Sequence, residues 1–210
     1  MAIPAAKENI LKRIRQALSN PVPLPFPLSE GSASVYQPVT DLPEVIFAEE
    51  FTKLQGKFAF CMDEEDLLQQ VRQLIAAKEW TKIYCSEDKW NGQFSNTTNL
   101  AGCDASVTSC EWLVARTGTI VMSAAQQSGR EASVYAPIHI CIAYTRQLVY
   151  NIKDALQFIK DGYPGNIPSL ITFASGPSRT ADIEKTLVTG VHGPKEVYLF
   201  LVESPATRPS

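Results

Sequence analysis

The sequence has few of the residues that hold a metal ion or a redox cluster. Only two histidines occur, His139 and His192, and the five cysteines form no C-x-x-C pair. Zinc ribbons and ferredoxin-type clusters need closely spaced cysteine or histidine ligands. We therefore predict no metal site and no iron–sulfur cluster in this chain. Several cysteines lie within apolar runs such as FAFC and HICIAY, and we expect buried thiols there.

The chain also lacks a strong charge of either sign and any long apolar run. Its 19 Lys+Arg and 22 Asp+Glu give a net charge of −3 and are scattered along the 210 residues. No broad positive field is available to attract nucleic acid or an anionic membrane. The start, MAIPAAKENILKRIRQAL, is interrupted by charges, and no later apolar run approaches the length of a membrane span. We expect a cytoplasmic protein that binds no nucleic acid.

The chain has two regions of different composition. Residues 1–44 hold a predicted amphipathic helix, from about Ala5 to Leu18, followed by an arm that carries six of the 14 prolines. Such proline spacing forbids helix and central strand alike. Whether the arm packs on the domain or on a partner subunit, or serves as a linker, stays open. Residues 45–210 form the predicted main domain.

Helical and strand-like patterns alternate through that main domain. We expect helices at 45–54, from 63, at 152–160 and from 181, strands at 58–61, 82–85, 105–115, 118–124, 139–144, 169–175 and 196–202, and a loop or an irregular segment at 87–102. Strands that alternate with helices favour right-handed crossovers. The predicted fold class is α/β, with an open, largely parallel sheet and helices on both faces.

The strongest candidate for a ligand site is the run GPSRTAD. Gly176 and Pro177 lead into Ser178, Arg179 and Thr180, which supply two hydroxyls and a guanidinium. A helix that opens at the next residues would add its free N–H groups, so the run is suited to a carboxylate or a phosphate. The competing interpretation is simple helix capping, with Arg179 paired to a surface acid.

Two further candidates are a glycine turn and the histidines. Thr117, Gly118 and Thr119 open a strand, and the glycine would let a ligand approach the backbone, although a plain hairpin turn explains the same pattern. His139 has apolar neighbours and is typical of a hydrogen-bonded core histidine. His192 lies between glycines in GVHGP and is better placed for function, unless it only caps a helix.

The run ITFASGPSRTADIEKTLVTGVHGPKEVYLFLV resembles the closing signature of the lactate utilization protein C family, the LUD domain. ARTGTIVM, the GR that follows it and PIHICIAY resemble the middle motifs of that family, so the resemblance covers about residues 45–202. It implies the fold of glucosamine-phosphate isomerases, ribose-phosphate isomerases and CoA transferases. It also implies a role in bacterial oxidation of L-lactate to pyruvate with two iron–sulfur partner proteins.

One residue departs from the family text. Arg116 stands where the family usually has glutamate before Thr-Gly-Thr, so a guanidinium replaces a carboxylate. If this position faces the ligand, Arg116 beside Arg179 favours a small anion such as lactate or pyruvate, and a potential general base is lost. The other interpretation is that residue 116 points outward.

These observations lead to one main functional hypothesis and one alternative. The main hypothesis is a subunit of a lactate-oxidising system that binds a small anionic ligand through the 117–119 and 176–180 residues and His192. It has no cofactor of its own, its catalytic residues are unassigned, and its oligomeric state stays open. The alternative is a stand-alone transferase, isomerase or ligase for a phosphorylated or CoA-linked substrate, with Glu111 as the nearest nucleophile.

Overall fold

The structure is a computed structural model that describes residues 41–97, 99–181, 187–190 and 192–204, with Val39 and five residues near the N-terminus. Contacts group the chain into two units, 1–38 and 39–210. In the first unit Asn9, Lys12, Arg13, Arg15 and Gln16 are helical, within the predicted N-terminal helix. Most of the proline-rich arm lies outside the described residues, but its last proline is not part of an extended arm, because Pro43 begins the helix Pro43–Lys53. No helix in the described part is both long and apolar enough to cross a membrane.

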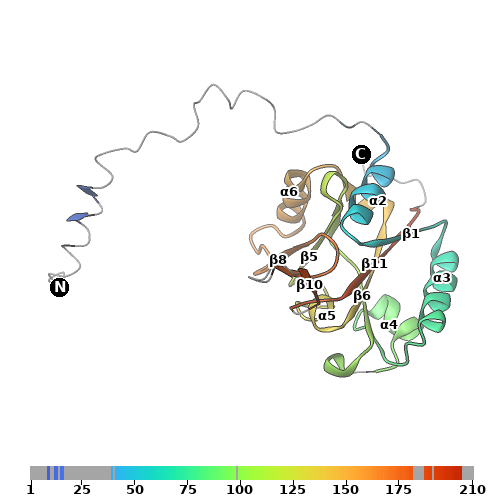
Figure 1. Cartoon of the computed structure of the whole chain (residues 1–210). Helices are drawn as coiled ribbons and strands as arrows, with labels where there is room; N and C mark the ends of the chain where they lie inside the picture. Colours follow the sequence, from blue (N-terminus) through green and yellow to red (C-terminus); the bar gives the residue numbers. More distant parts are fainter. Residues whose placement is uncertain are drawn as a thin grey trace. The chain divides into compact units, whose positions relative to one another are not determined.

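A parallel sheet of five strands forms the centre of the second unit (Figure 1). Its order is β1-β11-β6-β3-β2, and every neighbouring pair is parallel. The inner strands read as continuous apolar runs because both of their faces are covered. The bounds are β1 Lys57–Cys61, β2 Ile83–Tyr84, β3 Ala105–Thr108, β6 Ile138–Tyr144 and β11 Glu196–Val202.

Helices cover one face of this sheet, and a helix with a second sheet covers the other. On the first face lie α3 (Glu64–Ala77) and α4 (Asp88–Phe94), which bury Leu67, Val71 and Trp90. On the second face α2 (Pro43–Lys53) packs through two fully buried phenylalanines. The start of α3 is where the sequence predicts it, since Asp63 accepts a hydrogen bond from Asp66 N and caps the helix. The predicted α/β class with a largely parallel sheet is confirmed.

The second sheet has the order β7-β4-β5-β8 and is mainly antiparallel. Its outer face is covered by α6, which buries Ala155 and Ile159 against Val114 and Val121. The segment 105–115, predicted as one strand, is divided between the two sheets. The bounds are β4 Trp112–Val114, β5 Thr119–Ser123, β7 Leu148–Val149, β8 Ile171–Ala174 and α6 Ile152–Gly162, with short helices η3 Ala115–Thr117, η4 Thr145–Gln147 and α5 Ala132–Tyr135.

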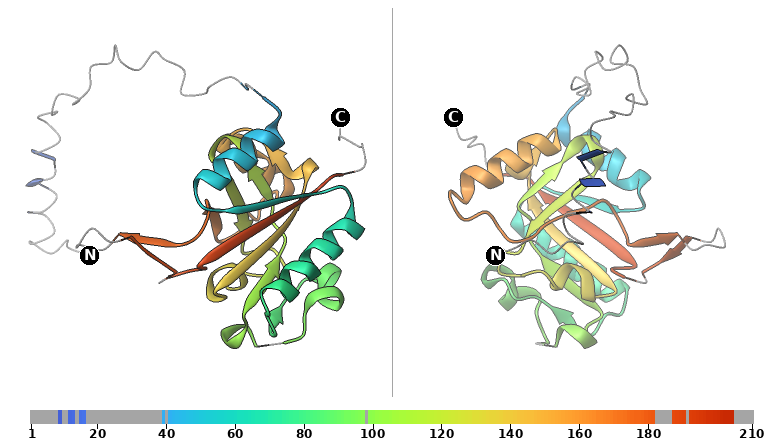
Figure 2. Two further views of the ribbon diagram at one scale, coloured as in Figure 1. Left: turned by 45° about the vertical axis from the view of Figure 1, so that its right-hand side comes forward. Right: turned by 90° about the vertical axis from the view of Figure 1, so that its left-hand side faces the viewer.

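Besides the strand predicted at 105–115, two further sequence predictions are wrong. Residues 179–181 and 187–189 form the strands β9 and β10 of an antiparallel hairpin where a helix was expected, and residues 182–186 lie outside the described part. Figure 2 shows this hairpin projecting from the rest of the second unit. Its alternating apolar residues fit a strand as well as a helix over so short a run. The polar stretch 87–102 also contains α4 and the short helix η2 (Leu100–Gly102), because Trp90 and Phe94 anchor α4 on the core.

Candidate functional site

The two glycine-containing motifs of the C-terminal third lie against each other. Ser178 N donates to Pro194 O at 3.0 Å, and Gly190 N donates to Ser178 O at 2.9 Å. A Cβ atom on Gly193 would lie 2.9 Å from the Cβ of Ser178, so only glycine permits this approach. The runs 176–180 and 190–194, predicted separately, are therefore one structural feature.

The turn at residues 117–119 contacts the start of the run 176–180 through Ser175. Thr119 Oγ1 lies 2.7 Å from Ser175 Oγ and 2.7 Å from Thr117 Oγ1. Thr119 is buried, and the turn connects the antiparallel strands β4 and β5. The hairpin interpretation of this turn therefore describes its geometry. We call residues 117–119, 175–180 and 190–194 together the motif band.

Gly118 and Gly176 bring the motif band against the end of α2. Gly118 has φ +55°, and an added Cβ would lie 2.4 Å from Phe51 N. Gly176 has φ +87°, and its added Cβ would lie 2.4 Å from Leu54 O. Pro177, the next residue, is buried. These contacts give both glycines a packing role that needs no ligand.

Arg179 also contacts α2 and does not precede a helix. Its Nη2 donates to Leu54 O at the carboxyl end of α2, where a cation interacts favourably with the helix dipole. Thr180, the next predicted ligand residue, pairs with Val188 in the hairpin. The expected anion cradle of helix N–H groups is therefore absent from the described residues after Arg179. The guanidinium is exposed and keeps further donors.

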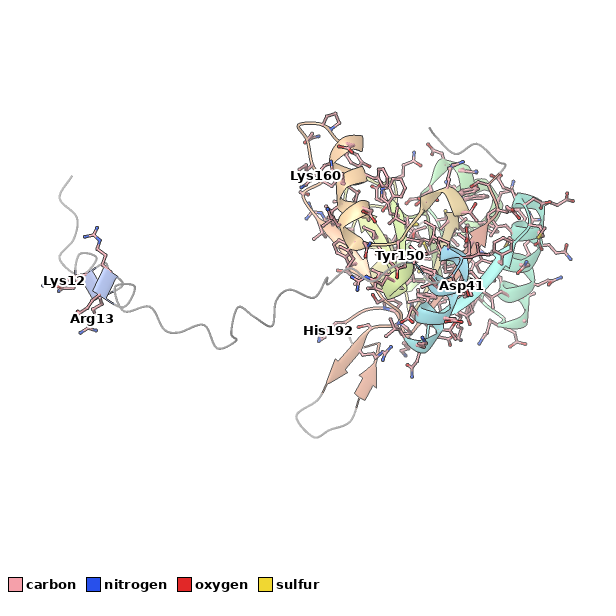
Figure 3. All side chains as sticks on the ribbon, turned by 90° about the horizontal axis from the view of Figure 1, so that it is seen from above. Lys12, Arg13, Asp41, Tyr150, Lys160 and His192 are labelled. Carbon is pink, nitrogen blue, oxygen red and sulfur yellow. The ribbon has the colours of Figure 1, made fainter. Side chains whose placement is uncertain are left out.

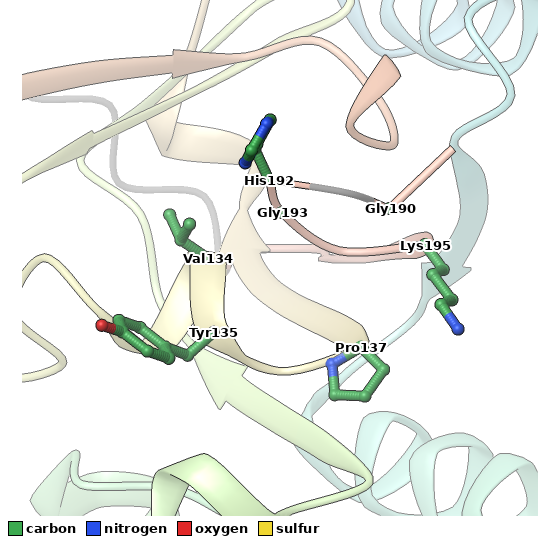
Figure 4. A pocket seen from close by; sticks show the side chains of 7 residues that line it. All are labelled: Val134, Tyr135, Pro137, Gly190, His192, Gly193 and Lys195. Carbon is green, nitrogen blue, oxygen red and sulfur yellow. The ribbon is translucent and has the colours of Figure 1, made fainter. Parts of the chain in front are cut away.

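A hollow of about 490 Å³ opens beside the motif band, and His192 lines it. Figure 3 places His192 near the base of the β9–β10 hairpin. The hollow lies at the amino edge of the parallel sheet, since Pro137 precedes β6 and Lys195 precedes β11. In Figure 4, His192 and α5 lie on one side and Lys195 lies on the other. The described lining residues are Val134, Tyr135, Pro137, Gly190, His192, Gly193 and Lys195.

Lys195 is held by its backbone while its ammonium group stays exposed. Its N–H donates to Pro137 O at 2.7 Å, which fixes the start of β11 beside that of β6. Its side-chain stem lies on Gly190, where an added Cβ would lie 2.2 Å from Lys195 Cγ. To the described part of the chain neither Lys195 nor His192 makes a side-chain hydrogen bond or ion pair. Two potential cations therefore face solvent at this hollow.

The carboxyl edge of the sheet holds a different set of polar groups, which the sequence analysis missed. Glu87, 6% exposed, follows β2 and accepts from Ser109 N at 2.7 Å and Ser109 Oγ at 3.0 Å. Gln126 donates to Ser109 Oγ at 3.3 Å and accepts from Ser123 N at 2.8 Å. Ser123 Oγ in turn donates to Glu111. One continuous hydrogen-bonded network thus links two carboxylates.

Glu111 lies at the outer end of this network. Its Oε1 accepts from the Tyr163 hydroxyl at 2.9 Å as well as from Ser123. Burial raises the pKa of Tyr163, and the hydrogen bond to Glu111 raises it further. The position of Glu111 after β3 follows the general rule that ligands of α/β proteins gather at the carboxyl ends of strands.

A third polar cluster lies farther along the carboxyl edge. Lys89 Nζ donates to Glu64 Oε1 at 2.5 Å, and the Tyr144 hydroxyl donates to the same oxygen at 2.6 Å. These bonds from Lys89 and Tyr144 lower the pKa of Glu64. The Lys89 ammonium and the Arg146 guanidinium each lie 4.7 Å from the centre of the Tyr144 ring. Within this cluster Lys89 is paired with Glu64, and Arg146 lies over the Tyr144 ring.

His139 and the cysteines have the structural roles that the sequence predicts, a hydrogen-bonded core histidine and buried thiols. His139 is 1% exposed, its Nε2 lies 2.8 Å from Thr108 Oγ1, and burial lowers its pKa to about 4. All five cysteines are free and buried. Within the described residues no three His, Cys, Asp or Glu side chains form a group that could hold a metal ion.

Arg116 is half-buried and engaged by its neighbours. Its Nε donates to Asn151 Oδ1 at 3.0 Å, and its N–H donates to Tyr150 O at 3.2 Å. Asn151 is the N-cap residue of α6. The guanidinium therefore ties η3 to the start of α6, which gives Arg116 a structural role.

The comparisons with known families give one match over most of the domain. Residues 89–202 match the model of the LUD domain. A crystal structure of a DUF162 family protein from Deinococcus radiodurans superposes with a TM-score of 0.59 at 16% identity, over 79% of this chain and 99% of that one. At this identity the likeness shows a shared fold.

Curated relatives give the second set of matches. An uncharacterized protein of Neisseria meningitidis is 30% identical over 118 residues, which are 55% of this chain and 47% of the relative. Lactate utilization protein C of Bacillus licheniformis is 36% identical over 129 residues, 60% of this chain and 52% of the relative. Lactate utilization protein C of Oceanobacillus iheyensis is 27% identical over 67% of this chain and 71% of the relative. The chain spans about half the length of the first two.

Proposed function

Because the chain belongs to the LUD domain family, we propose that it is a component of a system that oxidises L-lactate to pyruvate. The observation that carries this proposal is the family match, together with several relatives named lactate utilization protein C. The proposal assigns electron transfer to iron–sulfur partner proteins, because the sequence offers no closely spaced cysteine ligands.

The part that we propose for this chain is to bind an anionic group in the hollow at the amino edge. Lys195 and His192 supply hydrogen-bond donors there, and the backbone of Gly190 and Gly193 forms part of the lining. Ser178 supports the wall through its contact with Gly193. Thr119 contacts Ser175, and Gly118 and Gly176 pack against α2, so these residues position the segment that leads into Ser178.

Arg179 and Thr180, which follow Ser178, belong to the same proposed site. Arg179 is exposed, and apart from its bond to Leu54 O its guanidinium donates to none of the described residues, so further donors can meet a ligand or a partner protein. Arg179 and Thr180 are the first two residues of β9, the first strand of the projecting hairpin.

Lactate-dependent dye reduction tests this function. The two iron–sulfur proteins are co-expressed with the chain, without it, and with Lys195→Gln or the control Lys160→Gln, which changes another exposed lysine. We expect activity to require the chain, to fall with Lys195→Gln and to be unchanged with Lys160→Gln. Lactate oxidation that proceeds unchanged without the chain would contradict the proposal.

The environment of Glu111 supports a second candidate function, transfer of CoA between carboxylic acids by the chain alone. A carboxylate at a strand end that accepts hydrogen bonds from two hydroxyl groups on one oxygen is held in a fixed position, as a nucleophile requires. The test is turnover of acetyl-CoA with a series of carboxylates by the purified chain. Activity that disappears in Glu111→Gln would support this candidate, and no turnover would remove it.

A further inference from the structure

The hollow beside the motif band is too large for lactate or pyruvate alone. Its volume of about 490 Å³ falls within the roughly 300–1,000 Å³ of pockets that enclose drug-sized ligands. A small hydroxy acid would fill a minor part of it and leave most of the wall in water. The size indicates a ligand with a second, bulkier part.

The walls of the hollow divide into two chemically different parts. On α5, Val134 is 41% exposed and Tyr135 is 64% exposed, so both offer apolar surface to solvent. Together with Pro137 they form an apolar wall that carries one aromatic ring. Aromatic rings favour stacked or edge-to-face contact with other rings, and they lose little side-chain entropy on binding.

Lys195 supplies the cationic group of the opposite part of the hollow, while His192 lies on the side of α5. Lys195 lies across from Tyr135 in Figure 4, and its stem is fixed on Gly190. None of the described lining residues is acidic. Among the described lining residues none neutralises the ammonium group, which can attract an anion that reaches this end.

From this division we propose that the hollow binds a ring-bearing anion, a flat aromatic group joined to a phosphate or a carboxylate. The ring lies on Val134 and Tyr135, and the anionic group lies at Lys195. This inference rests on the anion site proposed above and adds the class of ligand that the site accepts.

Calorimetric titration of the full chain with a ring-bearing anion and its two halves tests the inference. The probe is 1-naphthyl phosphate, and the halves are 1-naphthol and inorganic phosphate. We expect 1-naphthyl phosphate to bind at least about tenfold more tightly than either half, because both walls then contribute.

Two matched variants separate the contributions of the walls. Tyr135→Ala is expected to weaken binding of 1-naphthyl phosphate to the level of inorganic phosphate and to leave inorganic phosphate itself unchanged. In Lys195→Gln we expect 1-naphthyl phosphate to bind no more tightly than 1-naphthol, because the phosphate loses its cationic partner. Phe158→Ala and Lys160→Gln, which change an exposed aromatic residue and an exposed lysine of α6, serve as controls and should change neither affinity.

The outcomes distinguish this inference from the anion site on which it rests. If inorganic phosphate binds in a Lys195-dependent way and the naphthyl group adds nothing, the ring-binding wall is refuted and the anion site stands. If no anion binds, both fail, while the role in lactate oxidation is still judged by dye reduction. Tight binding of 1-naphthyl phosphate that survives Tyr135→Ala would also overturn the inference.

Discussion

The two edges of the parallel sheet hold their polar groups in opposite ways. At the carboxyl edge Glu87 is 6% exposed, and Ser109 and Gln126 continue its hydrogen bonds to Ser123 and on to Glu111. At the amino edge the side chains of His192 and Lys195 are exposed and bond to none of the described residues.

This difference shows that the edge with more polar side chains is not necessarily the edge with groups available to bind a ligand. Polar groups that satisfy one another in a buried network stabilise the fold and leave few donors or acceptors for a ligand. Donors that face a hollow without protein partners are hydrated, so they cost the fold little free energy, and they can form hydrogen bonds to a ligand that binds there. The rule that α/β ligands lie at the carboxyl edge favours one site, and the open cationic hollow favours the other.

The largest expected effect separates packing residues of the motif band from those that line the hollow. In Gly118→Ala the new Cβ meets Phe51 N at 2.4 Å with φ +55°, and we expect the free energy of unfolding to fall by about 3 kcal/mol. Gly129→Ala is the matched control, since φ is +65° but nothing lies within 4 Å, and its expected loss is about 1 kcal/mol. Urea denaturation measures both. Equal losses would show that the contact with α2 contributes nothing.

The next largest expected effect is the pH dependence of the unfolding free energy that His139 causes. Burial lowers the pKa of His139 to about 4 from an ordinary value of 6.5. As the pH falls below 6.5 the unfolded chain binds a proton that the folded chain does not, so stability is lost between pH 6.5 and about 4. Between pH 7 and 5 the expected loss is about 2 kcal/mol.

A variant of His139 checks this prediction over the same pH interval. His139→Gln should flatten the dependence of the unfolding free energy on pH, because the group that binds a proton only in the unfolded chain is removed. Glu64 and Glu196 have pKa values below 4.5, and their stabilising contributions are lost only at lower pH. A wild-type curve that is already flat from pH 7 to 5 would argue that His139 is protonated inside the fold.

The smallest effect compares the two edges directly. Glu87→Ala leaves Ser109 N–H and its hydroxyl without their acceptor, and we expect a loss of about 1–2 kcal/mol. Lys195→Gln at the amino edge should change stability by less than about 0.5 kcal/mol. Glu49→Ala on the exposed side of α2 is the control for loss of a carboxylate. Thermal denaturation ranks the three, and an insensitive Glu87 would mean that its network does not stabilise the fold.

The sequence predicted most elements of the fold because their patterns are long or clearly ended. The apolar runs of β6 and β11 and the Asp63 cap of α3 are examples. It failed where context decides. Residues 179–181 and 187–189 are too short to distinguish strand from helix, and α4 depends on core contacts of Trp90 and Phe94 that polar neighbours conceal.

The candidate site was predictable in part. Local text singled out Ser178 and His192, but it could not show that Gly193 packs on Ser178 or that Gly118 packs on α2, because these contacts join distant segments. Lys195 directly follows the GVHGP motif and could have been found there. Tyr135 and Glu87 carry no local signal, since their exposure and burial follow from the assembled fold.

An amide NMR titration with 1-naphthyl phosphate tests most directly the claim that the open amino edge, and not the bonded carboxyl edge, receives the ligand. The account predicts the largest shifts at the amides of Tyr135, Gly190, Gly193 and Lys195. Largest shifts at Ser109, Glu111 and Ser123 would contradict it and place the ligand at the carboxyl edge.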